Sequence, residues 1–442
     1  RLVTRIESQG QVRDERDTRI GIRRFEITRE AFTINGERMF LRGVNRHQEY
    51  PYVGYAISPG ADYRDAQRIK EAGFDFVRLS HYPQSPDFMA AADELGLAVL
   101  NSILGWQFFN EDPAFRRQIL QTCRDLVRRD RNHPSVIAWE CSLNESAMPK
   151  PFVKQLHDIV HEEYPGDQAF SAGWQNDGYD IFIQARQHRI EHYTPPDRPY
   201  LVSEYGDWEY YALNAGLNQE RWKDLLPEAR TSRQLLSDGE VRLLQQRTNV
   251  QEAHNDNFNV PAFADAYWVM FDYNRGYADD LEASGIMSLE RVPKFSYHFF
   301  RSQRDADSGP VVHVASYWKA DSPKRVRVFA NVDEVELFLD GRSLGRRGPQ
   351  RDRISNHLSH PPVRFDVPAF EPGTLEAVGF IGGKAVAMHR VTTPGTPVKL
   401  VIEADAAGVC IAPRDLLFAR ARLVDSNGTT VPVSGERVQF AM

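Results

Sequence analysis

The chain has few cysteines and no long hydrophobic run. Its 442 residues include three cysteines, Cys123, Cys141 and Cys410, which form neither a disulfide framework nor a C-x-x-C zinc pattern. We expect them to be small buried side chains. No stretch approaches the roughly 20 consecutive apolar residues that a membrane-spanning helix needs. The sequence therefore predicts neither a disulfide-stapled protein nor a membrane-embedded one.

Basic residues are not in excess either. Lysine and arginine number 54 against 61 acidic residues, for a net charge of −7, and without a basic run this argues against a nucleic-acid partner. The chain also lacks a starting methionine and an apolar signal segment, so we expect a piece of a longer precursor. At 41% hydrophobic and 26% charged, the composition is that of a globular protein of about three domains. Compartment and oligomeric state stay open.

Short alternating segments occupy the first 37 residues. Residues 2–6, 22–27 and 31–34 alternate between apolar and polar side chains, and Asn35-Gly36 is a hairpin turn signal. Because 37 residues are too few for a core of their own, we expect residues 1–37 to be the end of an N-terminal β-sandwich domain.

Strand and helix patterns alternate from residue 38 to residue 305. The predicted strands are 39–45, 74–80, 97–101, 136–143, 168–173, 180–185, 200–204 and 264–270, and the predicted helices are 63–72, 86–95, 113–129, 151–164 and 241–251. Eight strands interleaved with helices match a (β/α)₈ TIM barrel, with a doubly wound sheet as the alternative. Polar residues just beyond several strands, such as Asn45-Arg46-His47, favour the barrel, because barrel active sites lie there.

Short strands without helices follow. Residues 326–330, 334–340, 363–367, 374–380 and 385–391 read as strands separated by Asp-Gly, Pro-Gly and Gly-Gly turns. They predict an immunoglobulin-like β-sandwich over residues 310–396. Residues 397–442 are predicted to be part of a further β-sandwich module.

Two glutamates stand where predicted barrel strands end. Glu145 lies in NHPSVIAWECSLNES (132–146) and Glu204 in PYLVSEYGDW (199–208). By count they end the fourth and seventh strands, across the lumen from each other, so both can face one sugar-sized space. Paired carboxylates of this kind suit glycoside hydrolysis, whereas a buried ion pair with an arginine is the structural alternative. Asn144 could bind a substrate hydroxyl or serve as a strand-end residue.

Four motifs in order resemble glycoside hydrolase family 2, which includes β-galactosidases, β-glucuronidases and β-mannosidases. They are NGERMFLRGVNRHQEYP (35–51), VRLSHYPQSPDF (77–88), NHPSVIAWECSLNES and LVSEYG, and GIMSLERVPKFSYHFFRSQ (285–303) extends the match. The resemblance implies a catalytic barrel flanked by β-sandwich domains. The stretch ANVDEVELFLDGRSLG (330–345) resembles such a trailing sandwich.

The resemblance also implies roles for single residues. Glu145 would be the general acid/base and Glu204 the nucleophile of a retaining mechanism. The other implied site residues bind the substrate: Asn144 at the sugar 2-hydroxyl, His47 and His81 in the glycone pocket, and Trp268 at the pocket floor. Arg42 and Arg78 are expected to pair with carboxylates and to keep Glu204 ionised. The structural alternatives are a turn residue for His81 and a barrel-core residue for Trp268.

Two positions depart from the family pattern. An extra acidic residue, Glu140, precedes the acid/base, and strand alternation predicts that it points away from the lumen. A tyrosine that usually follows the sixth strand is not recognisable, and His188 or Arg186 is expected to replace it.

The sugar is predicted from the segment before Gly285. Glu282-Ala283-Ser284 stands where β-glucuronidases of the family have Asn-x-Lys, and an anion there would repel a uronate. We therefore place β-galactosidase before β-glucuronidase or β-galacturonidase, and β-mannosidase third, although Arg186, Arg189 and Arg275 could supply a cation.

The predicted partner is an oligo- or polysaccharide, from which the enzyme removes terminal β-linked sugars. A catalytically inactive carbohydrate-binding barrel and a metal-dependent hydrolase are the rival interpretations. His47 and His81 are too few for a metal centre, so no metal ligand is assigned. No organic cofactor is expected, and a bound ion near the site stays open.

Overall fold

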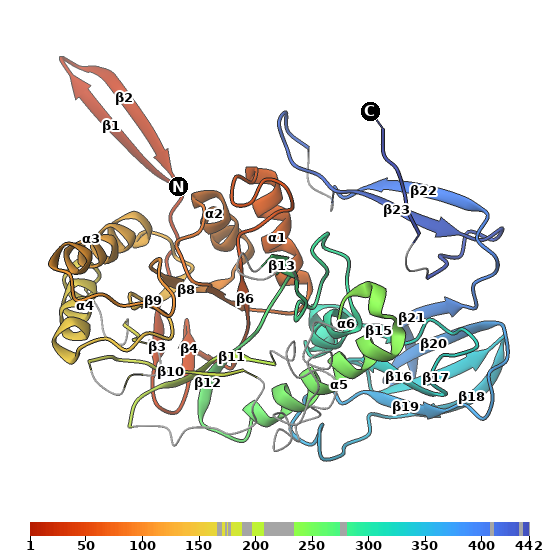
Figure 1. Cartoon of the computed structure of the whole chain (residues 1–442). Coiled ribbons are helices and arrows are strands. Elements are labelled where there is room, and N and C mark those ends of the chain that lie inside the picture. The colour runs from red at the N-terminus through yellow and green to blue at the C-terminus, as the bar shows by residue number, and fades with distance from the viewer. Residues whose placement is uncertain are drawn as a thin grey trace.

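The computed structural model describes residues 1–165, 170–172, 175, 178–187, 197–206, 234–274, 281–406, 411–432 and 436–441, with residues 186 and 187 in backbone only. A barrel of parallel strands and a β-sandwich lie side by side, and a two-stranded hairpin projects from the amino-terminal end (Figure 1). In these ranges no helix is both long enough and apolar enough to cross a membrane.

The barrel is formed by a parallel sheet of order β10-β11-β12-β6-β7-β8-β9. Its strands are β6 (Leu41–Arg46), β7 (Phe76–Leu79), β8 (Ala98–Ser102), β9 (Val136–Glu140), β10 (Phe182–Gln187), β11 (Tyr200–Tyr205) and β12 (Ala262–Tyr267). Phe170 pairs with Trp139 of β9, and Ser171 pairs with Ile181 next to β10. Among the described residues, this pair of bridges therefore takes the place of the fifth predicted strand and closes the barrel.

Helices surround this sheet, and the first five of them correspond to the predicted helices. They are α1 (Pro59–Glu71), α2 (Pro86–Leu95), α3 (Pro113–Asp130), α4 (Lys150–Glu163) and α5 (Glu240–Asn257), followed by α6 (Phe295–Arg301) and the 3₁₀ turns Leu236–Asp238 and Ala306–Ser308. Three of them begin with a capping side chain followed by proline: Ser58 for α1, Ser85 for α2 and Asp112 for α3. The predicted starts of α2 and α3 agree with these signals, whereas the predicted start of α1 at residue 63 lies four residues too late.

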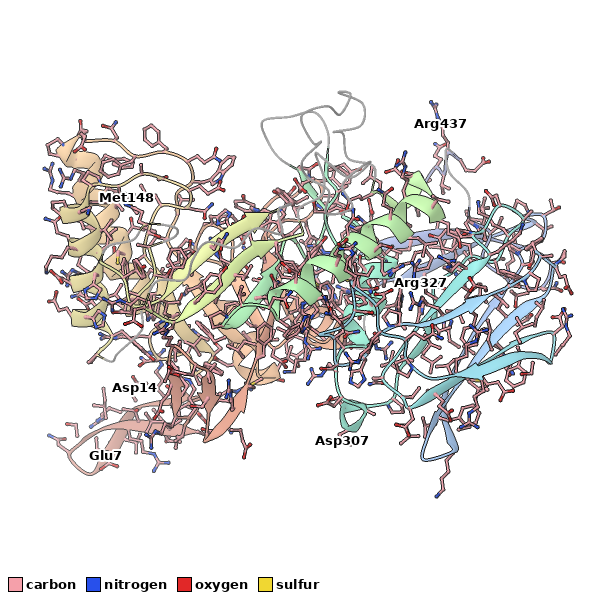
Figure 2. The ribbon with its side chains drawn as sticks, turned by 90° about the horizontal axis from the view of Figure 1, so that it is seen from below. Glu7, Asp14, Met148, Asp307, Arg327 and Arg437 are labelled. Carbon is pink, nitrogen blue, oxygen red and sulfur yellow. The ribbon has the colours of Figure 1, made fainter. Side chains whose placement is uncertain are left out.

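The first 37 residues divide into two parts. β1 (Leu2–Ser8) and β2 (Gln11–Thr18) form an exposed hairpin, and Figure 2 shows its Glu7 and Asp14 at the edge of the molecule. A second, three-stranded meander consists of β3 (Phe25–Ile27), β4 (Phe32–Ile34) and β5 (Glu37–Met39).

This meander packs against the barrel interior. Ile27 and Phe32 share a buried apolar cluster with Leu41, Phe76 and Leu201 of the barrel strands. These strand residues precede the polar residues at the carboxyl ends of the same strands. The meander therefore covers the end of the barrel opposite the candidate site.

The β-sandwich consists of two antiparallel sheets around one core. A sheet of order β15-β16-β19 faces a sheet of order β18-β17-β20-β21. The strands are β15 (Val312–Val314), β16 (Arg325–Ala330), β17 (Glu334–Leu339), β18 (Arg342–Arg347), β19 (Val363–Asp366), β20 (Thr374–Ile381) and β21 (Lys384–Thr392). Trp318, Leu337 and Phe365 are buried between the sheets.

A short antiparallel pair also belongs to the barrel region, where β13 (Tyr273–Asn274) pairs with β14 (Leu281–Glu282).

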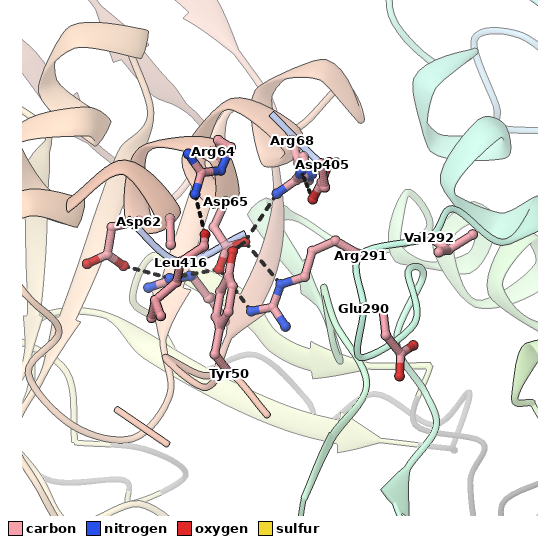
Figure 3. A network of polar contacts seen from close by, with 12 residues as sticks. Tyr50, Asp62, Arg64, Asp65, Arg68, Glu290, Arg291, Val292, Asp405 and Leu416 are labelled. Atoms are coloured by element: carbon pink, nitrogen blue, oxygen red, sulfur yellow. Dashed lines mark hydrogen bonds and ion pairs between the residues drawn. The ribbon is translucent and has the colours of Figure 1, made fainter. Parts of the chain in front are cut away.

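The last described elements, β22 (Lys399–Ala404) and β23 (Ala419–Val424), form an antiparallel pair that is held against α1. Arg64 of α1 donates to Asp415 at 2.8 and 3.0 Å, and Arg68 pairs with Asp405. Figure 3 shows this network continuing through Asp65, which accepts from Arg291 at 3.1 Å. Buried charges are costly unless paired, so this interface holds the last pair of strands in one position.

Candidate functional site

The centre of the candidate site is the guanidinium of Arg78 on β7. It donates two hydrogen bonds to Glu140, at 2.7 and 2.8 Å, and one to Glu204 at 2.6 Å. It also donates to the side-chain oxygens of Asn144, at 2.9 Å, and of Asn45, at 3.1 Å. All five residues are buried. A guanidinium has five N–H donors, so these contacts use its full hydrogen-bonding capacity.

A local irregularity in β11 turns Glu204 inward. Leu201 lies in the apolar cluster of the barrel interior, whereas Val202 and Tyr205 pack on the helix side. The pairing of β11 with β12 shifts in register between Val202 and Tyr205. Such a shift changes the face to which the following side chain points. Glu204 can therefore reach Arg78 inside the barrel although it is three residues beyond Leu201.

Burial dominates the electrostatics of Glu204, whose exposed fraction is 5%. Loss of hydration raises the pKa of Glu204 to about 8, against the effect of the neighbouring Arg78 cation. The charges of Glu145 and Glu140 act in the same direction as burial and contribute to this raised pKa. The expected contact between Arg78 and Glu204 is present, but it does not by itself keep the pKa of Glu204 low.

Glu145 lies in the loop after β9 and is only half-buried. Its φ of +50° places it in the left-handed region, where the chain turns sharply. Oε2 of Glu145 accepts hydrogen bonds from Trp106 Nε1 at 3.1 Å and from Gln107 Nε2 at 2.8 Å. Because Glu145 also affects the pKa of Glu204, both glutamates belong to one electrostatic cluster, as their strand count predicts.

Aromatic rings line the same end of the barrel. The ring of His81 stacks on Trp268, with centroids 5.4 Å apart, and His47 stacks on Tyr273 at 4.2 Å. His81 Nε2 lies 3.6 Å from Oε1 of Glu204, and no hydrogen bond to its Nδ1 is made by the described residues. The structure thus brings His47, His81 and Trp268 to the glutamates.

Both histidines are held in their neutral form. Burial lowers the pKa of His47 to about 3, and burial together with the Arg78 cation lowers that of His81 far below its ordinary value. A neutral imidazole can accept one hydrogen bond and donate another. These rings can therefore bind sugar hydroxyls without adding a charge beside Glu204.

Two expectations about this region are wrong. Arg42 does not contact Glu204. It pairs in register with Asp265 of β12, whose carboxylate faces His254 of α5. Since Leu41 faces the interior and side chains alternate along a strand, Arg42 lies on the outer face of β6. There burial lowers the pKa of Arg42, and the nearby charges of Asp75 and Asp265 oppose this effect only in part.

Glu140 points into the barrel, where it binds Arg78 and accepts from Ser102 Oγ at 3.2 Å. The expectation of an outward side chain assumed one strand through residue 143. Because β9 ends at Glu140 and the chain turns before Glu145, the alternation of side chains along a strand does not relate the direction of Glu140 to that of Glu145.

Three contributors were not assigned a site role from the sequence. Asn45 donates to the backbone oxygens of Ser203 and Ala266, at 2.9 and 3.2 Å, and thus joins β6, β11 and β12. The position of Asn45 at the end of a predicted strand was the feature of the sequence that could have identified it as a site residue. Trp106 and Gln107 follow β8 in a loop that has no such pattern, and only the tertiary contact with Glu145 identifies them.

Some expected site residues lie outside the described part of the chain. They are His188, Arg189 and Arg275, together with the side chain of Arg186. Within the described ranges, a group of three residues with metal-ligand geometry occurs at His157, His161 and Asp180, and none of these belongs to the candidate site.

Comparison with known proteins gives matches over the whole described architecture. The family model for the TIM barrel domain of glycosyl hydrolases family 2 matches residues 25–166, and a domain of unknown function matches residues 321–387. A β-galactosidase of Thermoanaerobacter pseudethanolicus is 30% identical over 465 residues, covering 99% of this chain and 59% of the relative. A β-glucuronidase of Formosa agariphila is 23% identical over 464 residues, covering 100% of this chain and 45% of the relative.

A solved structure shares the fold. A β-glycosidase from Bacteroides vulgatus superposes with a TM-score of 0.76 at 21% identity, covering 96% of this chain and 59% of that one. The chain thus spans 59% or less of the length of these proteins.

Proposed function

The chain belongs to glycosyl hydrolase family 2, and on this basis we propose that it carries the active site of a retaining exo-β-glycosidase with β-galactosides as preferred substrates. The observation that carries the proposal is the single buried cluster that contains Glu204, Arg78 and Asn144, with the Glu145 charge acting on it. Two carboxylates with different environments are what the double-displacement mechanism requires.

In the first step the Glu204 carboxylate attacks the anomeric carbon. The C–O bond to the leaving group breaks as Glu145 gives its proton to the leaving oxygen, and a glycosyl ester of Glu204 forms. The half-buried position of Glu145 leaves its carboxyl accessible for proton exchange. In the second step Glu145 takes a proton from water, whose oxygen attacks the same carbon and releases Glu204.

The neighbouring groups hold the sugar and the nucleophile in place. Arg78 fixes Oε1 of Glu204 at 2.6 Å and therefore limits its rotation. Asn144 lies between this cation and His81, whose Nε2 is 3.4 Å from Asn144 Nδ2, which suits contact with the hydroxyl beside the anomeric centre. The Trp268 ring supplies an apolar surface for a pyranose face.

A neutral sugar is favoured because the described cations near the closing segment are already paired with carboxylates of the protein. Lys294 is buried and bound to Asp272 at 2.8 Å, and Arg291 is bound to Asp65. Neither of these described cations is free for a uronate carboxylate. Glu282 lies buried in the same segment and accepts from Ser284 Oγ at 2.5 Å. β-Glucuronides remain the second candidate substrates, because a relative named β-glucuronidase matches the whole chain.

The catalytic assignment is tested with matched glutamine variants. Glu204→Gln should lower kcat by about 10⁴-fold or more on every substrate, because no glycosyl ester can form. Glu145→Gln should spare aryl glycosides with good leaving groups more than natural ones, because those need less protonation. Glu111→Gln, on an exposed surface, is the control. Near-normal turnover by folded Glu204→Gln would overturn the assignment.

The same measurements separate an enzyme from a sugar-binding barrel. If the chain were a sugar-binding protein, the parent chain and Glu204→Gln would both bind galactose, and neither would hydrolyse a β-glycoside. For the sugar, 4-nitrophenyl β-galactoside and β-glucuronide are compared at equal concentration. A higher kcat/KM on the glucuronide would reverse our order of substrates.

A further inference from the structure

A second cluster of chemically reactive side chains lies on the outer side of the barrel. His157 and His161 are four residues apart on α4, so their rings project from one face of the helix, with centroids 4.2 Å apart. Asp180 lies two residues before the start of β10. His157 Nε2 is 3.3 Å from Asp180 Oδ1, and His161 Nε2 is 2.7 Å from Asp180 Oδ2.

We propose that these three residues bind a divalent transition-metal ion of the Zn²⁺ class. Two imidazole nitrogens and one carboxylate oxygen are ligands that zinc prefers, and one such atom from each residue lies within 4.8 Å of the others. Tetrahedral ligands about 2.0–2.1 Å from Zn²⁺ stand about 3.4 Å apart. The three ligand atoms lie within 4.8 Å of one another, so small side-chain rotations that bring them to this spacing would admit the ion.

The surroundings of the three side chains support this site. Asp180 Oδ2 accepts a hydrogen bond from the backbone N–H of Phe170 at 3.0 Å, which orients the carboxylate. The other ring nitrogen of His157, Nδ1, is 3.5 Å from Asp158 Oδ1. A carboxylate on the non-ligating nitrogen is the usual outer partner of a metal-binding histidine.

Exposure leaves room for a fourth ligand. The side chains of His157 and His161 are each 28% exposed and that of Asp180 is 14% exposed. Water can therefore reach the ion and complete its coordination.

The position of the cluster indicates a structural role. α4 lies on the outside of the barrel (Figure 1), and Asp180 stands at the amino-terminal end of β10, whereas the candidate active site lies at the carboxyl ends of the strands. In the part of the chain that the structure describes, Phe170 and Ser171 connect β9 to the chain at β10 by isolated bridges and by the hydrogen bond from Phe170 N–H to Asp180. An ion bound to α4 and Asp180 would stabilise the barrel where Phe170 and Ser171 join β9 to β10.

Zinc titration of the EDTA-treated, dialysed protein tests the proposal. We expect one equivalent of Zn²⁺ to bind to the parent chain beyond what the double variant His157→Gln/His161→Gln binds. Zinc at about 100-fold its dissociation constant should raise the Tm of the parent by about 3–5 °C. The double variant should show no such rise. Because imidazole binds metal in its neutral form, the difference should shrink on acidification.

The control is another histidine–aspartate pair. His133 Nδ1 lies 2.6 Å from Asp93 Oδ2, and His133→Gln should keep the zinc equivalent and the Tm rise. Asp180→Asn keeps an acceptor for the Phe170 N–H, so it tests the carboxylate ligand without removing that hydrogen bond. Equal zinc binding by the parent and the folded double variant would overturn the proposal. So would a loss of zinc binding in His133→Gln as large as that in the double variant.

Discussion

Arg78 joins Glu140 to Glu204 by direct hydrogen bonds, so one buried cation serves two buried carboxylates from different barrel strands. Glu140 takes two of the donors and Glu204 takes one. Since the cation stabilises both ionised carboxylates while each disfavours ionisation of the other, the extra acidic residue before the acid/base affects the state of the nucleophile. This relationship leads to the first prediction.

Glu140→Gln should move the acidic limb of the kcat/KM profile to lower pH. The substitution removes a negative charge that raises the pKa of Glu204, so Glu204 would ionise more readily. The pH dependence of kcat/KM on an aryl β-galactoside measures the shift. Breaking the buried pair should also cost about 3–5 kcal/mol of stability, so the profile is recorded well below the Tm.

Arg78→Gln is the opposing variant. It removes the charge that lowers the pKa of Glu204, so the acidic limb should move to higher pH. Both variants disturb the same ion pair, but their effects on Glu204 have opposite signs. Shifts in one direction for both variants would contradict this electrostatic account.

Glu204→Gln should stabilise the fold more at pH 8.5 than at pH 5. The pKa of Glu204 is raised from 4.5 to about 8, so the folded chain binds this proton more tightly than the unfolded chain. Stability is therefore lost as pH rises through this interval, at about 1.4 kcal/mol per unit of pKa shift. Glutamine carries no proton to lose, and thermal unfolding at the two pH values measures the difference.

Glu30→Gln, on the exposed turn between β3 and β4, serves as the control for that comparison. An equal change in Tm for Glu204→Gln at both pH values would mean that burial does not penalise the Glu204 charge.

Removing the donors to Glu145 should weaken acid catalysis selectively. Trp106→Phe keeps an aromatic ring but loses the 3.1 Å hydrogen bond, and Gln107→Leu loses the 2.8 Å one. We expect kcat/KM to fall about 10-fold for glycosides with poor leaving groups, which is a part of the roughly 10²–10⁴-fold that a positioned acid contributes. Activated aryl glycosides should be affected less.

Phe108→Leu is the matched control, because Phe108 is exposed in the same loop and makes its contact to Ser146 through its backbone N–H. Equal losses on good and poor leaving groups in Trp106→Phe would indicate a general disturbance of the loop instead of a lost contact with the acid.

The sequence allowed prediction wherever the signal was local. Ser85 followed by proline starts α2 and caps it, and the predicted helix begins at the same proline. Strand alternation worked where strands are regular, and it failed at Glu140, because β9 ends there. At Glu204 the register shift in β11 reverses the alternation, so the inward direction of this side chain followed from its place at the end of the seventh predicted strand and not from periodicity.

The amino-acid sequence by itself determined the order of strands and helices, the helix caps and the two glutamates, because these depend on neighbours within a few positions. Only the tertiary structure decided that Arg78, and not Arg42, meets Glu204, and that His157 and His161 meet Asp180. Such contacts join residues far apart in the chain, and their geometry depends on how the barrel closes and on which face of each strand is turned inward.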